Sequence, residues 1–356
     1  GGVFTNNESI KKALIVGIAI LFLNVSFATI GVAIVSQDFN PLIPSGNILY
    51  VGGTGEGNYT TIQDAVNDSS DGDTVFVYDD SSPYYENVFV DKSINMIGEN
   101  RDTTVILGLN NGSVVSIFSN EIEISGFNIK SHENLTYSSG LNIVSNYSSI
   151  FGNNISSYKG YGIYLSGNYN SINNNFIGKD FLLGIGIGIN GDSNSISGNI
   201  ISNQIAGLIL INSNDNNITN NKISDNMYGI MLNGSSNNII SSNNMSMNIL
   251  NGIIFYYSTD NTIISNTIKN SNCGVELSFS KRNKIIENNF LRNSRHAYFE
   301  NCRNKWKNNY WNRPRLLPKT IVGVIRLNMP FPFQDVVIRW RNFDLRPSLK
   351  PYEIGA

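Results

Sequence analysis

The stretch Asn216-Asn217-Ile218-Thr219-Asn220-Asn221-Lys222-Ile223 is one copy of a motif that recurs along most of the chain. Its pattern is Asn-x-Ile-x-x-Asn-x-Ile, and successive copies begin about 22 residues apart, a period typical of solenoids. The copies begin at Ser148, Asn170, Asn194, Asn216, Asn238, Asn261, Asn283 and Asn304. A glycine has the same period and opens a short alternating apolar run, at Gly140, Gly162, Gly186, Gly207, Gly229, Gly252 and Gly274.

The alternation within each repeat predicts short strands, because every run is too short for an amphipathic helix. Ile, Leu, Val and Phe fall on one face, and Asn, Ser and Thr fall on the other. One repeat cannot bury its apolar face alone, but stacked repeats enclose a continuous core between parallel strands about 4.8 Å apart. We therefore expect an all-β fold, a single-stranded right-handed parallel β-helix with about ten or eleven coils and three short sheets.

Asparagine makes up roughly one residue in six, far above ordinary usage. Asn tolerates the left-handed backbone conformation and hydrogen-bonds its own chain, so it suits the sharp corner between two sheets. Because the same corner recurs in every coil, we expect Asn to stack on Asn, with amides bonded along the stack. A polar binding surface is the alternative interpretation of these residues, and the repetition favours the structural one.

The chain has 356 residues and a formal net charge of −2, and charged residues make up 15% of it. This balance gives no basic surface for nucleic acid. The two cysteines, Cys273 and Cys302, lie in different registers of the repeat, so we expect two unpaired thiols and no disulfide framework. We predict one elongated domain and a monomer.

The N-terminal region predicts export. Lys11-Lys12 precede the apolar run 13–35, and Ser26-Phe27-Ala28 resembles a small-residue cleavage site. Residues 1–36 are therefore expected to be a signal peptide, or an uncleaved membrane anchor formed by residues 13–35. In both cases the remainder is exported, to the cell surface or outside the cell.

The remaining boundaries are predicted from composition and pattern. Residues 37–57 contain prolines and a glycine cluster and are predicted to be a linker. The β-helix is predicted over 58–312, with an N-terminal helical cap at Tyr59–Val66. Residues 313–356 are predicted to be a capping segment with two strands, Thr320–Leu327 and Val336–Trp340, and several aromatic residues.

The run from Tyr59 to Ile106, together with the Asn-rich coils, resembles two groups of pectin-lyase-like β-helix proteins with PbH1 repeats. One group is the pectin methylesterases, and the other is the exported proteins similar to the NosD copper-processing factor, which are common on archaeal surfaces. The resemblance implies the fold and an archaeal-type surface protein. The catalytic Gln-Asp-Thr-Leu and Asp-Phe-Ile-Phe-Gly segments of the esterases are missing here, so the resemblance does not extend to their activity.

One column of residues could carry hydrolytic chemistry. Asp215 and Asp260 each precede the first residue of a copy, two coils apart, and so about 9.6 Å from one another. That separation is close to the spacing of carboxylates in inverting glycosidases. Arg282 and Arg303 continue the column and are candidate binding residues. The structural alternative is an ion pair between Asp260 and Arg282.

Metal ligands are sparse. Copper sites use His, Cys and Met, but the chain has only His132 and His296, in distant coils, so copper is not expected. Asp71-Gly72-Asp73 and Asp79-Asp80 leave calcium open, although such carboxylates usually form turns. We expect no metal site and no cofactor.

Asn-x-Ser/Thr sequences are frequent in an exported chain that is rich in Asn and Ser. The glycosylation candidates are Asn58, Asn111, Asn134, Asn146, Asn217 and Asn233.

We expect an exported NosD-like module that binds glycans of the envelope or surroundings, or that is structural. One alternative is a carbohydrate-active enzyme, a polysaccharide hydrolase or lyase, with Asp215 and Asp260 as catalytic residues. Another alternative is an adhesin or spacer without a small ligand. The sequence favours a non-enzymatic role, because no complete catalytic motif is found.

Overall fold

The computed structural model describes residues 46–109, 112–131, 139–157, 159–178, 184–327 and 336–354. The predicted signal or anchor segment, residues 1–36, lies outside these ranges. Residues 44–356 form one compact unit, to which all the described ranges belong.

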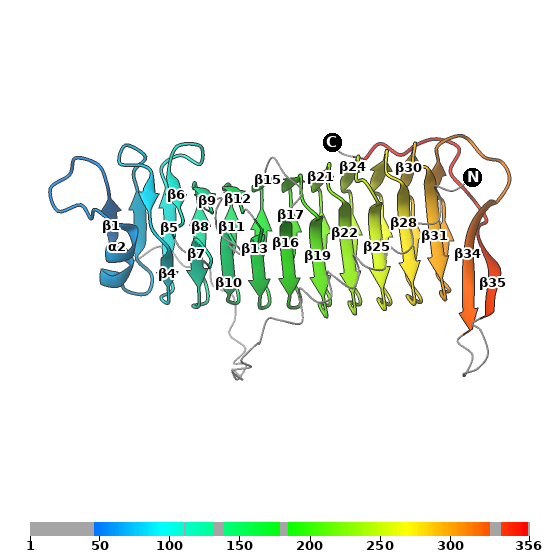
Figure 1. The fold of residues 1–356 in the computed structure, drawn as a ribbon, viewed down its shortest axis with the longest axis horizontal. Coiled ribbons are helices and arrows are strands. Elements are labelled where there is room, and N and C mark those ends of the chain that lie inside the picture. Colours follow the sequence, from blue (N-terminus) through cyan, green and yellow to red (C-terminus); the bar gives the residue numbers. More distant parts are fainter. Residues whose placement is uncertain are drawn as a thin grey trace, which may run out of the picture. The chain divides into compact units, whose positions relative to one another are not determined.

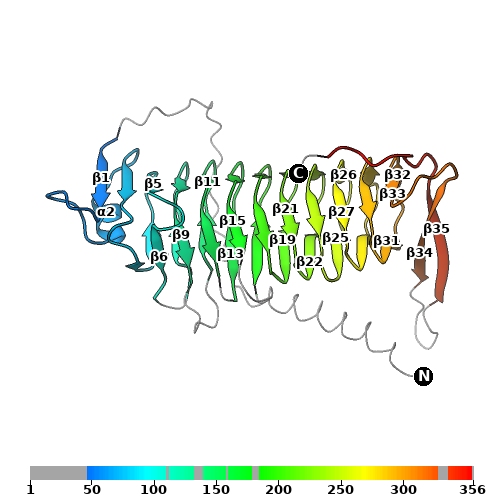
Figure 2. The same ribbon diagram turned by 90° about the horizontal axis from the view of Figure 1, so that it is seen from above.

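The described residues form an all-β, right-handed parallel β-helix with three sheets, as predicted (Figures 1 and 2). Each coil contributes one strand to each sheet, and the strands of successive coils pair in register. Ile218, for example, pairs with Ile196 of the preceding coil and Ile240 of the next. The predicted number of coils agrees with the eleven strands of sheet 3.

Sheet 1 contains β4 (Val88–Val90), β7 (Val115–Ile117), β10 (Leu141–Val144), β13 (Tyr161–Ser166), β16 (Ile185–Asn190), β19 (Ala206–Ile211), β22 (Tyr228–Asn233), β25 (Asn251–Tyr256), β28 (Cys273–Ser278), β31 (Arg295–Glu300) and β34 (Lys319–Leu327). Sheet 2 contains β1 (Ile48–Val51), β2 (Thr74–Val77), β5 (Asn95–Gly98), β8 (Glu123–Ser125), β11 (Ser149–Phe151), β14 (Ser171–Asn173), β17 (Ser195–Ser197), β20 (Asn217–Thr219), β23 (Ile239–Ser241), β26 (Thr262–Ile264), β29 (Lys284–Ile286), β32 (Lys305–Lys307) and β35 (Val336–Asp344). Sheet 3 contains β3 (Tyr84–Tyr85), β6 (Val105–Leu107), β9 (Asn128–Lys130), β12 (Asn154–Ser156), β15 (Phe176–Gly178), β18 (Ile200–Ser202), β21 (Lys222–Ser224), β24 (Asn244–Ser246), β27 (Thr267–Lys269), β30 (Asn289–Leu291) and β33 (Tyr310–Trp311).

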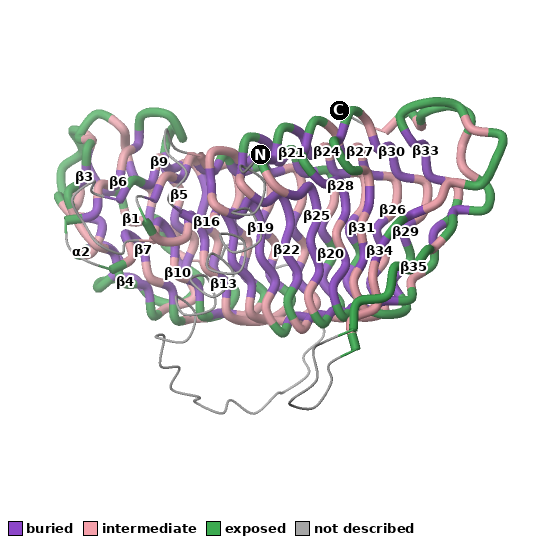
Figure 3. The backbone as a smooth tube through the Cα atoms, turned by 45° about the vertical axis from the view of Figure 1, so that its right-hand side comes forward, coloured by how far each residue is buried: buried purple, intermediate pink, exposed green. Residues whose placement is uncertain are grey.

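The inward face of every sheet is a column of apolar side chains that encloses a buried core. Buried positions recur from coil to coil along the backbone (Figure 3). In sheet 2 this column contains Ile150, Ile172, Ile196, Ile218, Ile240, Ile263 and Ile285. Each buried isoleucine contributes about 1.5–3 kcal/mol relative to an exposed one. The stacked repeats therefore provide the core that one coil could not form alone.

Two buried asparagine ladders run along the corners that flank sheet 2. The backbone N–H of each member donates to the side-chain oxygen of the corresponding residue in the next coil. The distance from Asn221 N to Asn243 Oδ1 is 2.9 Å, and the other distances are similar. The first ladder contains Ser148, Asn170, Asn194, Asn216, Asn238, Asn261, Asn283 and Asn304. The second contains Asn153, Asn175, Asn199, Asn221, Asn243, Asn266, Asn288 and Asn309. The predicted stacking is confirmed.

Left-handed asparagines occur at the corners, as predicted, but they are not the ladder asparagines. The left-handed residue is the one before the ladder position, such as Asp215 with φ 57°, Asn237 with φ 58° and Asn220 with φ 56°. That residue turns the chain, so the following Asn points inward and is buried. The ladder asparagines therefore satisfy the buried backbone of the corner, while their predecessors face solvent.

The periodic glycines open the strands of sheet 1 because no side chain fits there. A Cβ on Gly252 would lie 2.4 Å from Cγ2 of Ile268, on sheet 3, and 2.8 Å from the carbonyl oxygen of Gly274. Sheets 1 and 3 therefore approach closely at this corner. His296 of β31 occupies the same register at the end of the column.

The N-terminal cap begins earlier than predicted. Ile48–Val51, in the predicted linker, form β1, which pairs with β2. The apolar Ile-Leu-Tyr-Val run extends sheet 2 despite the glycines around it. The predicted helix is α2 (Ile62–Asp68), whose N-terminus is held by the Glu86 carboxylate through Ile62 N–H at 2.8 Å and Gln63 N–H at 2.9 Å.

The C-terminal segment caps the last coil with an antiparallel hairpin, as predicted. β34 pairs with β31, and β35 meets β32 at Asp344. The Asp344 carboxylate is fully buried and accepts from Asn309 N–H at 2.9 Å, Asn309 Nδ2 at 3.1 Å and Trp311 Nε1 at 3.1 Å. Asp344 therefore ends the second asparagine ladder, in place of the next asparagine.

Neither Cys273 nor Cys302 forms a disulfide bond, as predicted. Cys302 ends a third ladder, of serines, in which Ser280 N–H lies 3.2 Å from Cys302 Sγ. The same ladder contains Ser213, Ser235 and Ser258. Burial raises the pKa of the Cys302 thiol to about 11, so it is protonated and inert at neutral pH.

Candidate functional site

Asp215 and Asp260 occupy one column two coils apart, as predicted, since Asp215 N–H donates to Ser236 O and Asn237 N–H donates to Thr259 O. Asp215 is exposed and Asp260 is half-buried. Asp260 forms the predicted ion pair with Arg282, with Nη2 to Oδ2 at 2.6 Å and Nε to Oδ1 at 2.8 Å. Arg282 holds the pKa of the Asp260 carboxyl below its ordinary value. An ionised carboxylate with both oxygens engaged is not arranged to donate a proton, so the ion pair accounts for Asp260. The catalytic role of Asp215 and Asp260 stays a prediction.

Arg303 does not continue this column as predicted. Asp260 N–H donates to Lys281 O, but Arg282 N–H donates to Arg303 O. Between the inward residues Cys302 and Asn304 only Arg303 is present, whereas two residues separate Ser280 from Asn283. The last corner is therefore one residue shorter, and Arg303 takes the position of Lys281 in the preceding coil rather than the position of Arg282.

Exposed aromatic pairs lie along this same corner between sheets 1 and 2. The rings of Tyr147 and Tyr169 stack with centroids 5.1 Å apart at 5°, and those of Tyr257 and Phe279 stack at 5.1 Å and 13°. Tyr169 is 57% exposed and Tyr257 is 63% exposed. Large apolar faces held rigidly in solvent are typical of binding surfaces rather than of structural positions. We call these four residues the aromatic corner.

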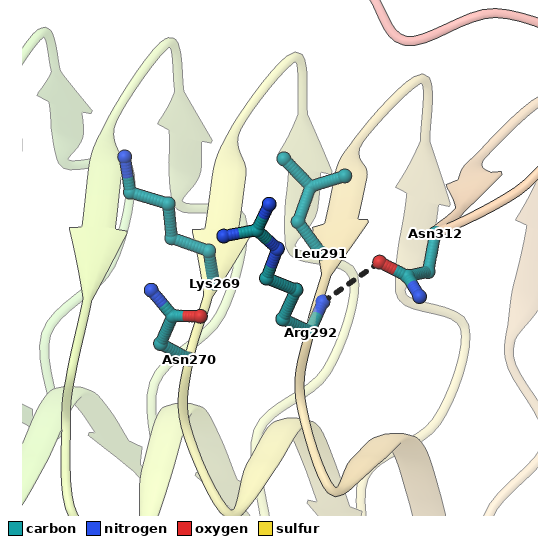
Figure 4. A pocket seen from close by; sticks show the side chains of 5 residues that line it. All are labelled: Lys269, Asn270, Leu291, Arg292 and Asn312. Carbon is teal, nitrogen blue, oxygen red and sulfur yellow. Dashed lines mark hydrogen bonds between the residues drawn. The ribbon is translucent and has the colours of Figure 1, made fainter.

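The opposite corner, between sheets 3 and 1, carries an open pocket of about 560 Å³. It is lined by Lys269, Asn270, Leu291, Arg292 and Asn312. The Arg292 N–H donates to Asn312 Oδ1 at 3.0 Å, which fixes the backbone of the pocket floor (Figure 4). The Lys269 and Arg292 side chains extend along the same side of the two coils (Figure 4). We call this pocket the cationic corner.

The outer face of sheet 1 connects the two corners through β25, β28 and β31. The Arg295 guanidinium lies 4.8 Å from the centroid of the Tyr298 ring, and Asn251 Nδ2 donates to Glu276 Oε2 at 2.9 Å. Burial and Glu276 raise the pKa of Tyr228 to about 12. This part of the face therefore offers aromatic rings, hydrogen-bonding groups and charges between the two corners.

The glycosylation candidates differ in accessibility. Asn217 and Asn233 are exposed on the outer faces of sheets 2 and 1. Asn58 donates to Gly52 O at 2.6 Å, and Asn146 Oδ1 accepts from Asn168 N–H at 2.8 Å. Asn111 and Asn134 lie outside the described residues.

The absence of a copper site stays a prediction. In the part of the chain that the structure describes, no three His, Cys, Asp or Glu side chains gather closely enough to hold a metal ion. His296 faces the cations Lys319 and Arg315, which together with burial lower its pKa to about 4 and would repel a metal ion. His132 lies outside the described residues.

Two of the carboxylates considered for calcium accept hydrogen bonds from the backbone. Asp73 accepts from Asn47 N–H at 2.7 Å and from Ser70 N–H at 2.8 Å. Asp80 accepts from Gly53 N–H at 3.0 Å. These contacts are those of turn-forming residues.

Within the described ranges, no helix has the length and apolarity needed to cross a membrane.

Comparison with known proteins relates the chain to β-helix proteins. The family model described as periplasmic copper-binding protein (NosD) matches residues 183–325, which is less than half of the chain. A search of curated protein sequences found no match.

Several solved structures share the fold. The mannuronan C-5 epimerase AlgE4 A-module of Azotobacter vinelandii is 12% identical, with a TM-score of 0.57 over 69% of this chain and 83% of that one. The enzymatically active domain of tailspike protein 2 of bacteriophage CBA120 is 12% identical, with a TM-score of 0.54 over 78% of this chain and 55% of that one. The chain thus spans about half of that tailspike domain.

A third structure is the DFA-IIIase of Arthrobacter chlorophenolicus A6 without its lid, 14% identical, with a TM-score of 0.51 over 74% of this chain and 94% of that one. At these identities the likeness shows the fold alone. The predicted archaeal origin stays a prediction, because no comparison bears on it. The chain is therefore a right-handed parallel β-helix protein, and its residues 183–325 are similar to the NosD family.

Proposed function

We propose that this protein is an exported module that binds glycans across the outer face of sheet 1. The observation that carries the proposal is the aromatic corner, where two pairs of rings are held stacked and exposed. A pyranose ring has an apolar C–H face that packs on an aromatic ring, while its hydroxyl groups bond to polar neighbours. The proposal of export is supported by the periplasmic description of the matching family.

The rigidity of the corner favours binding. The rings are attached to residues whose backbone is fixed, since Tyr257 N–H donates to Ser278 O at 3.1 Å and Phe279 N–H donates to Glu300 O at 2.9 Å. Little conformational entropy is lost when a ligand binds a surface that is already ordered. Equivalent positions of successive coils also repeat along the axis of the β-helix, and this repetition suits a polymeric ligand.

The test is retention of the full chain by a panel of acidic and neutral polysaccharides, with reducing ends and unsaturated products measured in the same samples. The Tyr257→Ala/Phe279→Ala double variant should bind at least about tenfold more weakly, because both ring faces are lost. The matched control is Tyr85→Ala, since Tyr85 is 59% exposed on sheet 3, away from this corner. Equal retention of both variants and the unaltered chain would contradict the proposal. Turnover of a polysaccharide would replace it with an enzymatic function.

A further inference from the structure

Charge is distributed very unevenly along the chain. Seventeen of the 25 Lys and Arg residues lie in residues 260–356, together with seven of the 27 Asp and Glu residues. This part has a formal charge of +10, and the preceding 259 residues have a charge of −12. The small net charge of the chain therefore conceals a cationic C-terminal third, which attracts anions over a distance set by ionic strength.

The cationic corner lies within this third, and no acidic residue lines it. Among the residues described, neither Lys269 nor Arg292 forms an ion pair. The two side chains come from adjacent coils, because Lys269 pairs in register with Leu291, the residue before Arg292. Two like charges on adjacent coils repel each other, and an anion between them would weaken that repulsion.

We infer that Lys269 and Arg292 bind an anionic group of the glycan, so that the ligand is an acidic polysaccharide that carries carboxylate or sulfate groups. This inference rests on the proposed function and narrows it from glycans to acidic glycans. The Lys269 ammonium and the Arg292 guanidinium supply charge, and the Asn270 amide supplies neutral hydrogen bonds at the same rim.

The geometry favours a glycan over other polyanions. The cationic corner and the Tyr257–Phe279 stack share one strand of sheet 1, since Lys269 precedes β28 and Phe279 follows it, whereas Arg292 precedes the next strand, β31, and Tyr257 follows the previous one, β25. A six-residue strand separates the corners by about 20 Å. An acidic glycan that spans this face meets the cations at one end and the ring stack at the other. Nucleic acid would instead need bases stacked along a continuous basic groove.

The experiment measures binding of the full chain to three probes by calorimetry at low and at physiological salt. The probes are polygalacturonate, a neutral mannan of matched length and a single-stranded DNA of matched charge. The test variant is Lys269→Gln/Arg292→Gln. The control is Lys130→Gln/Lys222→Gln, which removes the same charge from exposed positions of sheet 3 in the acidic part of the chain.

We expect polygalacturonate to bind more tightly than mannan, and the test variant to bind it about tenfold more weakly while the control does not. Mannan binding should be equal in all three proteins. If mannan binds as tightly as polygalacturonate and the test variant changes nothing, the inference is wrong and the proposed function stands. If DNA competes equally with polygalacturonate, the site is a general polyanion surface and the inference is also wrong. If neither glycan binds, the proposed function itself fails.

Discussion

At the scale of single residues, the ladder asparagines form many of the buried side-chain hydrogen bonds of this protein. Asn243 is buried, and its Nδ2 donates to Ile218 O at 2.9 Å, Ser241 O at 3.0 Å and Asn266 Oδ1 at 3.0 Å. Its Oδ1 accepts two more bonds from Asn221. One side chain thus bonds to groups of three coils, including backbone groups of two, which alanine cannot do.

We predict that Asn243→Ala lowers the free energy of unfolding by about 3 kcal/mol, because several buried donors and acceptors lose their partners. Urea unfolding followed by circular dichroism measures the change. Asn217→Ala is the control, since Asn217 is exposed on the outer face of sheet 2. It should stay within about 0.5 kcal/mol of the unaltered chain. Equal effects of the two substitutions would mean that the ladder adds little stability.

His296 gives the protein a defined pH dependence. Its pKa is lowered to about 4 by burial and by Lys319 and Arg315. Above about pH 6.5 the imidazole is neutral in both states, so it adds no pH dependence. Between about pH 6.5 and about pH 4 only the unfolded chain takes up the proton, so the free energy of unfolding falls as pH falls, by up to about 3 kcal/mol. Below about pH 4 this contribution is constant.

Unfolding measured from pH 7.5 to pH 3.5 tests this prediction. His296→Asn should lose the additional slope between about pH 6.5 and about pH 4, whereas the slope due to carboxylates stays. Parallel curves for the two proteins would show that His296 is not buried in the neutral form.

At the scale of elements, the close approach of sheets 1 and 3 sets the sequence requirement of each coil. We predict that Gly252→Ala destabilises the protein by about 1–3 kcal/mol, because the new Cβ overlaps Ile268 Cγ2 and the Gly274 carbonyl oxygen. Thermal unfolding compares it with Thr262→Ala on the outer face of β26, which should be nearly neutral. A neutral Gly252→Ala would mean that the corner can open without cost.

Much of this architecture could be predicted from the sequence, because stacking gives the same position of every coil the same surroundings and therefore the same residue type. The first residue of each copy, such as Asn216 or Asn238, was identified from the period alone. The direction of its side chain was not, because that depends on the left-handed residue before it. β1 was missed because Ile48–Val51 is too short to show a period and lies between glycines.

The candidate site was predicted less well than the fold. Tyr257 and Phe279 have the same offset from Asn261 and Asn283, so aligning the repeats would have shown their stacking. Lys269 and Arg292 are out of register by one residue, so the period did not group them, although both line one pocket. The charge asymmetry was lost because charge was summed over the whole chain.

At the scale of the whole molecule, the ladders need an end, and Asp344 provides it. We predict that Asp344→Ala lowers the free energy of unfolding of the C-terminal coils by about 3 kcal/mol, because Asn309 and Trp311 lose a buried acceptor. Hydrogen exchange should show faster opening of β33 to β35 and little change near β20, because solenoid contacts are local. Asp344→Asn keeps one acceptor oxygen, so its exchange rate in β33 to β35 should lie between that of the unaltered chain and that of Asp344→Ala. Uniform exchange along the chain would contradict a local role.

The internal coils differ from this end in one respect that matters for the evolution of the protein. Each coil from β16 to β30 gives its neighbour the same asparagine-ladder bonds that it takes from the coil before it. Duplication or deletion of one 22-residue coil therefore leaves every bond type in place, provided that the asparagine and glycine positions are kept. The distance between the acidic N-terminal part and the cationic third can change in steps of about 4.8 Å without redesign of either end. The length of the protein is thus a trait that selection can adjust separately from its binding surface.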